Sequence, residues 1–237
     1  MTEDRLYFRQ LLSGRDFAAA DPLAIQMVNF SYLIGDRQTG EVLLVDPAYG
    51  VGDLLDLLDA DGMRPAGVLV THHHPDHVGG SMMGHSIEGV AELLGRRPVP
   101  VHAHRDEAPL VVAVTGVEPG DVVAHDSGDR VEVGAVGITL LHTPGHTPGS
   151  QCFLVDGMLV AGDTLFLEGC GRTDLPGSDP AAMYDSLQRL ASLPGGTVVY
   201  PGHRYSAAST ATIGAVKEIN MVFKPRTKEA WLAAFGR

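Results

Sequence analysis

The feature that most constrains this chain is the distribution of its histidines. Seven of its 11 histidines lie in short stretches bounded by glycine, proline and aspartate, and the densest stretch, residues 72–77, reads HHHPDH. It follows a short apolar stretch, residues 67–70, that is predicted to be a buried strand. Imidazole and carboxylate groups are the ligands that zinc and iron prefer in proteins. One loop therefore offers four candidate ligands, enough to serve two metal ions: His72, His74, Asp76 and His77.

Three later segments carry the same kind of residue. Residues 142–150 contain His146, residues 162–164 contain Asp163, and residues 200–203 end in His203. Each segment follows a predicted strand, and strand ends are where layered α/β folds place their sites. We therefore expect these loops to meet the 72–77 loop at one metal centre.

The remaining pattern predicts a layered α/β fold in a single domain spanning residues 1–237. Period-2 and apolar runs predict strands at 27–34, 41–45, 67–70, 99–102, 122–124, 130–133, 136–141, 151–155, 158–160 and 197–200, with those from 122 to 160 forming a meander. Helices are expected around 54–58, over 81–94 and 106–114, from Asp179-Pro180 to before 194, over 210–219 and near 228–235. Strands with helices inserted among them favour two sheets sandwiched between helices.

Charge and composition exclude several classes of protein. The net charge of −12, from 17 basic and 29 acidic residues, disfavours binding to the phosphate backbone of nucleic acid. No apolar run reaches the roughly 18 residues that a membrane-spanning helix needs. The opening Met1-Thr2-Glu3-Asp4 lacks the pattern of a signal peptide. With only Cys152 and Cys170, both expected to be reduced thiols, the sequence predicts a cytoplasmic protein.

The four histidine and aspartate segments, in this order, resemble the glyoxalase II branch of the metallo-β-lactamase superfamily, and the likeness runs from residue 27 to about 220. The resemblance implies a four-layer αββα sandwich. It also implies two divalent metal ions, with zinc expected. The first ion would be held by His72, His74 and His146, and the second by Asp76, His77 and His203. Asp163 would bridge the two, and Asp76 would also orient the attacking hydroxide.

The function that this resemblance implies is metal-dependent hydrolysis of small acyl thioesters through a hydroxide shared by two metal ions. Arg172 and Tyr205 match positions that contact the thiol carrier, although Asp174 replaces an aromatic residue common in the family. A short tail, at about residues 206–237, stands in place of the helical domain of glyoxalase II enzymes. The expected partner is a small thioester or thiol-derived molecule, and the protein could form a homo-oligomer.

Three alternatives remain open at this level. The string GCGRTD at residues 169–174 equally resembles persulfide dioxygenases, which would use one iron on His72, His146 and Asp163. Hydrolysis of a lactone or lactam is a weaker alternative that the same metal pair could support. A protein that only stores or senses metal is disfavoured, because storage needs no open coordination positions.

The other histidines and the two cysteines are assigned structural roles. Six histidines fall outside the family positions and are expected not to bind metal, with His142 the strongest exception as a group that supports the site: His73, His85, His102, His104, His125 and His142. Cys152 is expected in the core, and Cys170 in packing beside the site. The apolar face of the predicted helix at 81–94, which includes Met82 and Met83, is expected to be core, a substrate wall or a subunit contact.

Overall fold

The computed structural model describes residues 5–236, so the opening Met1-Thr2-Glu3-Asp4, where we expected no signal peptide, lies outside the described residues. The strands of the two large sheets are β1 (Leu6–Leu12), β2 (Phe30–Asp36), β3 (Glu41–Val45), β4 (Arg64–Leu69), β7 (Val101–His104), β8 (Val122–His125), β9 (Arg130–Val133), β10 (Val136–His142), β11 (Gln151–Val155), β12 (Met158–Gly162), β13 (Val198–Pro201) and β14 (Ala211–Thr212). A separate hairpin consists of β5 (Gly80–Met82) and β6 (His85–Ile87).

The α-helices are α1 (Pro22–Met27), α2 (Val51–Ala60), α3 (Pro75–Val78), α4 (Val90–Arg96), α5 (Ala108–Thr115), α6 (Pro180–Ala191), α7 (Ile213–Ile219) and α8 (Lys228–Phe235). Two short 3-10 turns, Pro119–Asp121 and Met221–Phe223, complete the secondary structure of the described chain. Within residues 5–236, no helix is long and apolar enough to cross a membrane.

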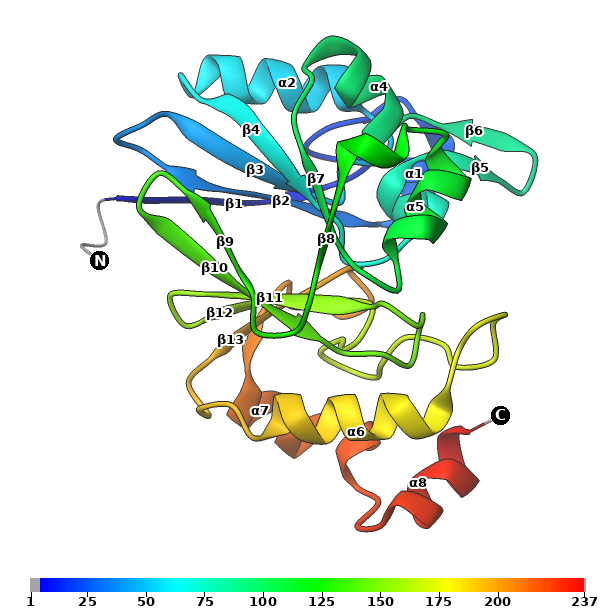
Figure 1. The fold of residues 1–237 in the computed structure, drawn as a ribbon. Coiled ribbons are helices and arrows are strands. Elements are labelled where there is room, and N and C mark those ends of the chain that lie inside the picture. Colours follow the sequence, from blue (N-terminus) through cyan, green and yellow to red (C-terminus); the bar gives the residue numbers. More distant parts are fainter. Residues whose placement is uncertain (1–4, 237) are drawn as a thin grey trace.

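Two six-stranded sheets lie face to face (Figure 1). The first has the strand order β1-β2-β3-β4-β7-β8, and the second has the order β14-β13-β12-β11-β10-β9. The predicted meander is therefore only partly right. Strands β9 to β12 form antiparallel neighbours, whereas β8 pairs parallel with β7 and belongs to the first sheet.

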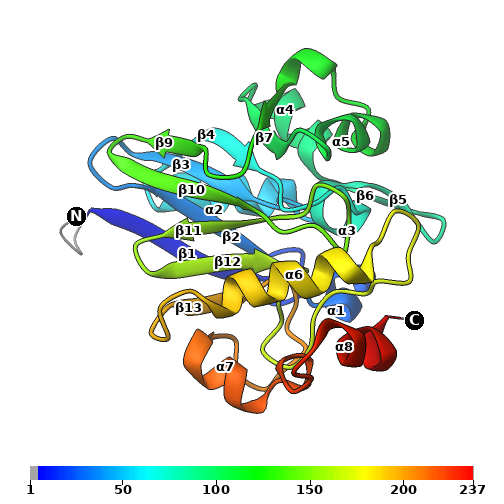
Figure 2. The ribbon, with the colours of Figure 1, turned by 60° about the horizontal axis from the view of Figure 1, so that its bottom comes forward.

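Three separate apolar cores define four layers. One lies between the first sheet and α2, α4 and α5, a second lies between the two sheets, and the third lies between the second sheet and α6, α7 and α8. Neighbouring residues of a strand serve different cores, as a period of two requires: Leu33 faces the helices and Ile34 faces the other sheet. Figure 2 shows α6 lying along the second sheet, with α7 and α8 beside it. The αββα sandwich expected from the sequence is confirmed.

The covering helices follow from simple local rules. In α2, Leu54, Leu55 and Leu58 are buried on one face against the first sheet. In α6, the Asp179 side chain caps the first turn by accepting hydrogen bonds from two backbone N–H groups, and Pro180 occupies the first helical position. The predicted start of this helix at Asp179-Pro180 is thus confirmed.

The helix predicted over residues 81–94 is wrong. Residues 80–87 form the β5–β6 hairpin, and helix begins only at Val90. Met83 and Gly84 both adopt positive φ, which is the backbone of a tight two-residue hairpin turn. The tail prediction at 210–219 is wrong at its start as well, because Ala211–Thr212 is a short strand that pairs with β13 before α7 begins. Two elements near the N-terminus, β1 and α1, were not predicted.

The fold brings the ends of several strands to one edge of the sandwich. β12 and β13 run parallel, so the residues that follow them lie side by side. The start of β11 is tied to the end of β4 by two hydrogen bonds of 2.9 Å, from the Gln151 backbone N–H to the Thr71 carbonyl and from the Gln151 side chain to the Val70 carbonyl. The start of β2 meets the 201–203 segment through a hydrogen bond of 2.8 Å from the Phe30 N–H to the Gly202 carbonyl.

Candidate metal centre

The loop after β4 places four of the predicted residues at this edge. His72 leaves the strand buried, at 1% exposure, and α3 is a single helical turn that begins with Pro75. A short helix that starts on proline fixes the backbone at residues 75–78, so Asp76 and His77 are both held in buried positions. The second half of the HxHxDH pattern is thus presented by a rigid turn.

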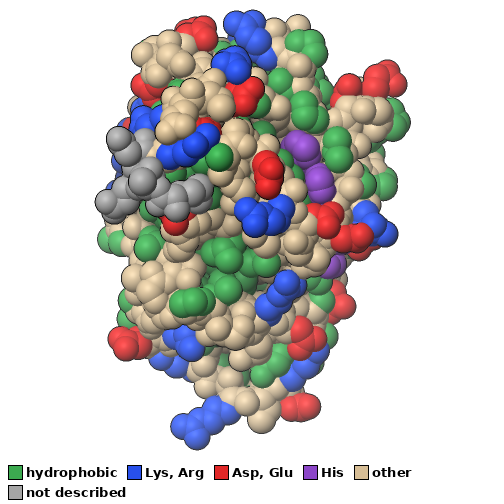
Figure 3. All heavy atoms as spheres, turned by 60° about the vertical axis from the view of Figure 1, so that its left-hand side comes forward, with side chains coloured by type: hydrophobic (Ala, Val, Ile, Leu, Met, Phe, Trp, Pro, Cys, Tyr) green, Lys and Arg blue, Asp and Glu red, His purple; other side chains and the backbone are tan. Residues whose placement is uncertain are grey.

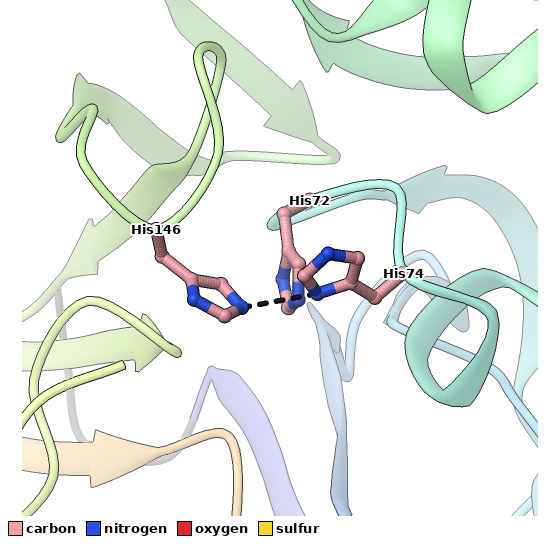
Figure 4. Close-up of side chains that lie close together, drawn as sticks. All are labelled: His72, His74 and His146. Carbon is pink, nitrogen blue, oxygen red and sulfur yellow. Dashed lines mark hydrogen bonds between the residues drawn. The ribbon is translucent and has the colours of Figure 1, made fainter. Parts of the chain in front are cut away.

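One donor group combines this loop with the loop after β10. His72, His74 and His146 each offer a ring nitrogen, and these atoms all lie within 4.8 Å of one another. Figure 4 shows the three rings turned toward a common point, with Nε2 of His146 3.0 Å from Nδ1 of His74. Residues 72 apart in sequence therefore form one compact set of nitrogen donors.

A second donor group lies beside the first and consists of Asp76, His77 and His203, again with donor atoms within 4.8 Å of one another. Nε2 of His77 lies 3.2 Å from Nε2 of His203, and Oδ2 of Asp76 lies 3.4 Å from Nε2 of His203. This group mixes imidazole with carboxylate, whereas the first consists of imidazoles alone.

Asp163 lies between the two groups. Its carboxylate oxygens are 3.7 Å from Nε2 of His146 on one side, and 3.5 and 3.4 Å from Nε2 of His77 and His203 on the other. Burial alone would raise the pKa of this carboxyl, but the neighbouring histidines, His203 first, hold it below its usual range. Asp163 is therefore an ionised carboxylate that faces donors of both groups.

In four of these histidines, Nδ1 is hydrogen-bonded within the protein. Each Nδ1 faces one hydrogen-bond acceptor: His72 the Thr71 hydroxyl oxygen at 3.0 Å, His77 the Asp46 carboxylate at 2.9 Å, His146 the Arg172 carbonyl at 2.8 Å and His203 the Met27 carbonyl at 2.8 Å. These partners favour the tautomer with hydrogen on Nδ1, which leaves Nε2 with a lone pair. Four lone pairs consequently face the centre of the site.

The pKa values of the histidines differ between the two donor groups. Burial and the surrounding imidazoles lower the pKa of His72 well below its usual value and that of His74 to about 4. Burial also opposes protonation of His77, but the carboxylates of Asp76 and Asp163 outweigh it and raise its pKa to about 10. Positive charge is therefore favoured beside the carboxylates.

The residues present fit a pair of divalent cations. Nε2 of His72 and Oδ1 of Asp163 are buried with no hydrogen-bond partner among residues 5–236, which is costly unless another group occupies the space between them. Lone pairs that face each other at 3.0 to 3.2 Å repel unless a proton or a cation lies between them. Imidazole and carboxylate donors in this number are typical of zinc and iron sites.

Asp46 was not predicted as part of the site. It accepts hydrogen bonds from the Thr71 backbone N–H at 2.8 Å, the Thr71 hydroxyl at 2.5 Å and His77 Nδ1 at 2.9 Å. Its positive φ of 49° is a conformation that aspartate tolerates better than most residues. The available sequence signal is the pair Asp46-Pro47 directly after strand β3.

Glu107 was also missed. This fully buried carboxylate accepts hydrogen bonds from the His73 backbone N–H at 2.7 Å, the Thr147 hydroxyl at 2.9 Å and the Gly149 N–H at 2.8 Å. It also lies 2.5 Å from Nδ1 of His73. Glu107 thereby joins the loop that carries His72 and His74 to the loop that carries His146.

A cavity of about 790 Å³ opens above the donor groups, and both predicted substrate contacts line it. Arg172 is exposed, and its guanidinium forms two hydrogen bonds of 2.8 Å to the Asp174 carboxylate. The Tyr205 ring is 55% exposed and stacks on His203 at 4.7 Å between ring centroids. Cys170 also lines the cavity, and burial raises its thiol pKa to about 12, so it is a neutral thiol there.

The remaining histidines lie outside both donor groups. His142, the expected exception, stacks on His104 at 3.7 Å between ring centroids. Its Nε2 lies 2.9 Å from the Pro148 carbonyl, so it contacts the His146 loop and no donor of the site. Cys152 is fully buried in β11, as expected.

Comparison with known proteins agrees with this geometry. Residues 26–203 match the family described as "Metallo-beta-lactamase superfamily", a span that includes all seven donor residues. The chain belongs to the metallo-beta-lactamase superfamily. A hydroxyacylglutathione hydrolase from Xanthomonas euvesicatoria pv. vesicatoria (strain 85-10) is 38% identical over 192 residues, which cover 81% of this chain and 67% of that relative. Within the superfamily, the chain is a metallo-hydrolase of the glyoxalase II-like branch.

Two solved structures are similar over most of the chain. ETHE1 from Myxococcus xanthus has a TM-score of 0.77 and 29% identity, and the match covers 98% of this chain and 90% of that one. TTHA1623, solved in a di-iron-bound form, has a TM-score of 0.66 and 32% identity, with 82% and 95% covered. Both likenesses place the present chain in the same fold.

Proposed function

We propose that this protein hydrolyses small acyl thioesters at a site that holds two divalent metal ions. The observation that carries the proposal is the pair of adjoining donor groups with Asp163 between them. A site for one ion would need only three or four such residues. Seven residues converge here, and two of their buried donor atoms, Nε2 of His72 and Oδ1 of Asp163, have no hydrogen-bond partner among residues 5–236.

The proposed ligands follow the two groups. His72, His74 and His146 would hold one ion, Asp76, His77 and His203 would hold the other, and Asp163 would contact both. Zinc suits this donor set, and so does iron, which TTHA1623 contains as a pair. When bound, the two ions would lower the pKa of a shared water and polarise the carbonyl that it attacks.

The protein's own groups would orient the reaction. Oδ2 of Asp76 is fixed 3.2 Å from the Asn29 side-chain nitrogen, which leaves its other oxygen available to accept a hydrogen bond from the attacking water. The leaving group is a thiolate, and thiols have pKa values near 8.5, so departure needs no dedicated general acid. The cavity lining agrees with this. Burial keeps the Cys170 thiol protonated, and the Arg172 guanidinium keeps its charge, so neither group is suited to donate a proton.

The substrate proposal extends to the thiol carrier. Similarity to a hydroxyacylglutathione hydrolase supports a glutathione thioester as the first substrate to try. Arg172 and Tyr205 line the same cavity and are proposed to contact the carrier, with the guanidinium pairing to one of its carboxylates in place of Asp174. We also propose a cytoplasmic location, which fits two free cysteines.

A second candidate function is persulfide dioxygenation at a single iron on His72, His146 and Asp163. The likeness to ETHE1, which extends over nearly the whole of both chains, favours keeping it. In that case Asp76 and His203 would support the site from outside the coordination sphere.

Two measurements test the proposal. Elemental analysis of protein never exposed to chelator should give close to two divalent ions per chain, and a panel of glutathione, coenzyme A and smaller thiol esters should release free thiol. One iron per chain, together with oxygen uptake on a persulfide and no thioester cleavage, would establish the dioxygenase instead. Less than half an equivalent of any transition metal would contradict both functions.

A further inference from the structure

The two walls of the cavity differ in chemistry. One wall comes from the N-terminal half of the chain, through α1, α3 and the β5–β6 hairpin, and the other comes from the segment between β12 and α6 and from Tyr205. Figure 1 shows the hairpin on one side of the site edge and the yellow segment before α6 on the other. A substrate held at the metal centre therefore has a different surface on each side.

The N-terminal wall is apolar. Apart from the donor residues, the side chains that it contributes are those of Met27, Pro75, Ser81, Met82 and Met83. None is charged, and the serine hydroxyl is the single polar group. The opposite wall carries both of the charged side chains that line the cavity outside the donor groups, Glu168 and Arg172. Recognition by charged side chains is thus confined to one side.

The local structure does not explain why position 83 is a methionine. Its side chain is 78% exposed, the highest value among the exposed large apolar side chains of residues 5–236. It occupies a left-handed position, φ 52°, at the tip of the hairpin, where asparagine, aspartate or glycine is the usual residue. Neither burial nor turn preference accounts for a methionine here, whereas contact with an apolar ligand does.

Methionine also suits such a wall physically. Its unbranched side chain has several rotatable bonds and a polarisable sulfur, so two neighbouring methionines can adapt to groups of different shape. Met82 and Met83 are on a two-stranded hairpin whose strands pair only with each other among the described residues. The wall is therefore adjustable as well as apolar.

We propose that the site takes thioesters with an apolar acyl group, and that Met82 and Met83 bind this group while the thiol carrier lies against the wall that contains Arg172. This inference rests on the proposed thioesterase function. Burying one methylene group contributes up to about fourfold in affinity. Specificity should consequently rise with acyl length on a fixed carrier.

The test is a series of glutathione thioesters with acetyl, propionyl, butyryl and hexanoyl groups, assayed with the metal-loaded protein. We expect kcat/KM to rise about two- to fourfold per methylene up to butyryl. The double variant Met82→Ser, Met83→Ser should flatten this dependence. Met221→Ser serves as the matched control, because Met221 is 64% exposed and does not line the cavity, and its variant should keep the slope.

The outcomes separate the inference from the function on which it rests. Hydrolysis of all four esters at equal efficiency, or an unchanged slope in the double variant, would overturn the acyl wall and leave the thioesterase intact. No hydrolysis of any thioester on any carrier would overturn the function itself. Binding of unreactive S-(2-oxoalkyl) glutathiones, measured by calorimetry, gives a second readout, and their Kd should fall with alkyl length in the parent protein and not in the double variant.

Discussion

The described residues contain two clusters of histidines, and only one of them has two adjoining donor groups with a carboxylate between them. The first is the donor set around Asp163. The second, which we call the flank cluster, consists of His102, His104, His125 and His142 on β7, β8 and β10. Histidine side chains reach the surface on the side of the molecule drawn in Figure 3, among interspersed acidic and basic groups. Clustering of histidines alone therefore does not identify a metal site.

The difference lies in what holds the ring nitrogens. In the metal centre, four Nδ1 atoms are held by protein acceptors. The Nε2 atoms of His77, His146 and His203 lie 3.4 to 3.7 Å from carboxylate oxygens of Asp76 or Asp163. In the flank cluster, histidines contact one another. Nδ1 of His102 lies 2.9 Å from Nε2 of His125, and His104 stacks on His142 with ring planes only 8° apart. Donor atoms of His104, His142 and Asp106 also lie within 4.8 Å of one another. However, Nε2 of His142 faces the Pro148 carbonyl and Asp106 is exposed, so this group lacks the buried donors of the metal centre.

The largest expected effect comes from removing a donor residue of the metal centre, and the same change in the flank cluster serves as the comparison. His146→Ala and Asp163→Ala should each remove bound metal and lower kcat/KM by several orders of magnitude, since both nucleophile and electrophile depend on the ions. The pair His104→Ala and His142→Ala should keep the metal content and stay within about tenfold of parent activity, because these residues act at most through the His146 loop. Metal analysis and thioester assays on the four variants decide it. Loss of metal from a flank variant would contradict the view that the flank cluster does not hold metal.

A smaller effect is expected from the carboxylates that hold imidazoles. Asp46→Asn tolerates the same left-handed backbone but weakens the hold on Nδ1 of His77, and it should reduce metal affinity and kcat/KM about 10- to 100-fold. Asp129→Asn is the matched control, because Asp129 lies 3.4 Å from Nδ1 of His125 in the flank cluster. Its variant should match the parent in competition with a chelator. Equal losses in both variants would show that the two clusters are not different in kind.

The smallest effect concerns the response of the flank cluster to pH. Burial, and next the charge of His125, lower the pKa of His102 to about 4, below the unfolded value of about 6.5. The native state thus binds fewer protons than the unfolded state between these values, and stability falls as pH drops from about 6.5 toward 4. Because His102 is partly exposed, we expect its share to be roughly 1–2 kcal/mol.

Urea unfolding at pH 7.5 and pH 4.5 checks this expectation. His102→Gln should lose less stability over the interval than the parent protein does. His85→Gln, at an exposed hairpin position, should behave like the parent. An equal loss in all three proteins would mean that His102 is not held neutral by the fold.

The residues of the metal centre were easier to predict from the sequence than the residues around it. His72, His74, Asp76 and His77 lie within six consecutive residues, and the short helix α3 holds the last two of them. Asp46 and Glu107 are single acidic residues that reach the site through tertiary contacts with residues 25 or more positions away, so no local pattern reveals them.

The same reasoning explains the error at residues 81–94. The apolar spacing of Met82, Ile87, Val90 and Leu93 mimics a helical face, yet it arises from a hairpin followed by a short helix. Gly84 next to Met83 was the signal for a turn, and the helical spacing concealed it. The four-layer arrangement was predictable because strand and helix patterns alternate along most of the chain. The assignment of β8 to the first sheet was not predictable, because the sequence of a strand does not specify which strand it pairs with.

The seven donor residues come from both sheets, at positions from 72 to 203, so no preformed site exists in the unfolded chain. Metal that binds only the native state adds to its stability, by about 1.4 kcal/mol for each tenfold rise in free metal above Kd. The lifetime of the protein in a cell should therefore follow metal supply. In metal-starved cells the empty chain would open more often and be degraded sooner, so its abundance would fall before any change in its synthesis.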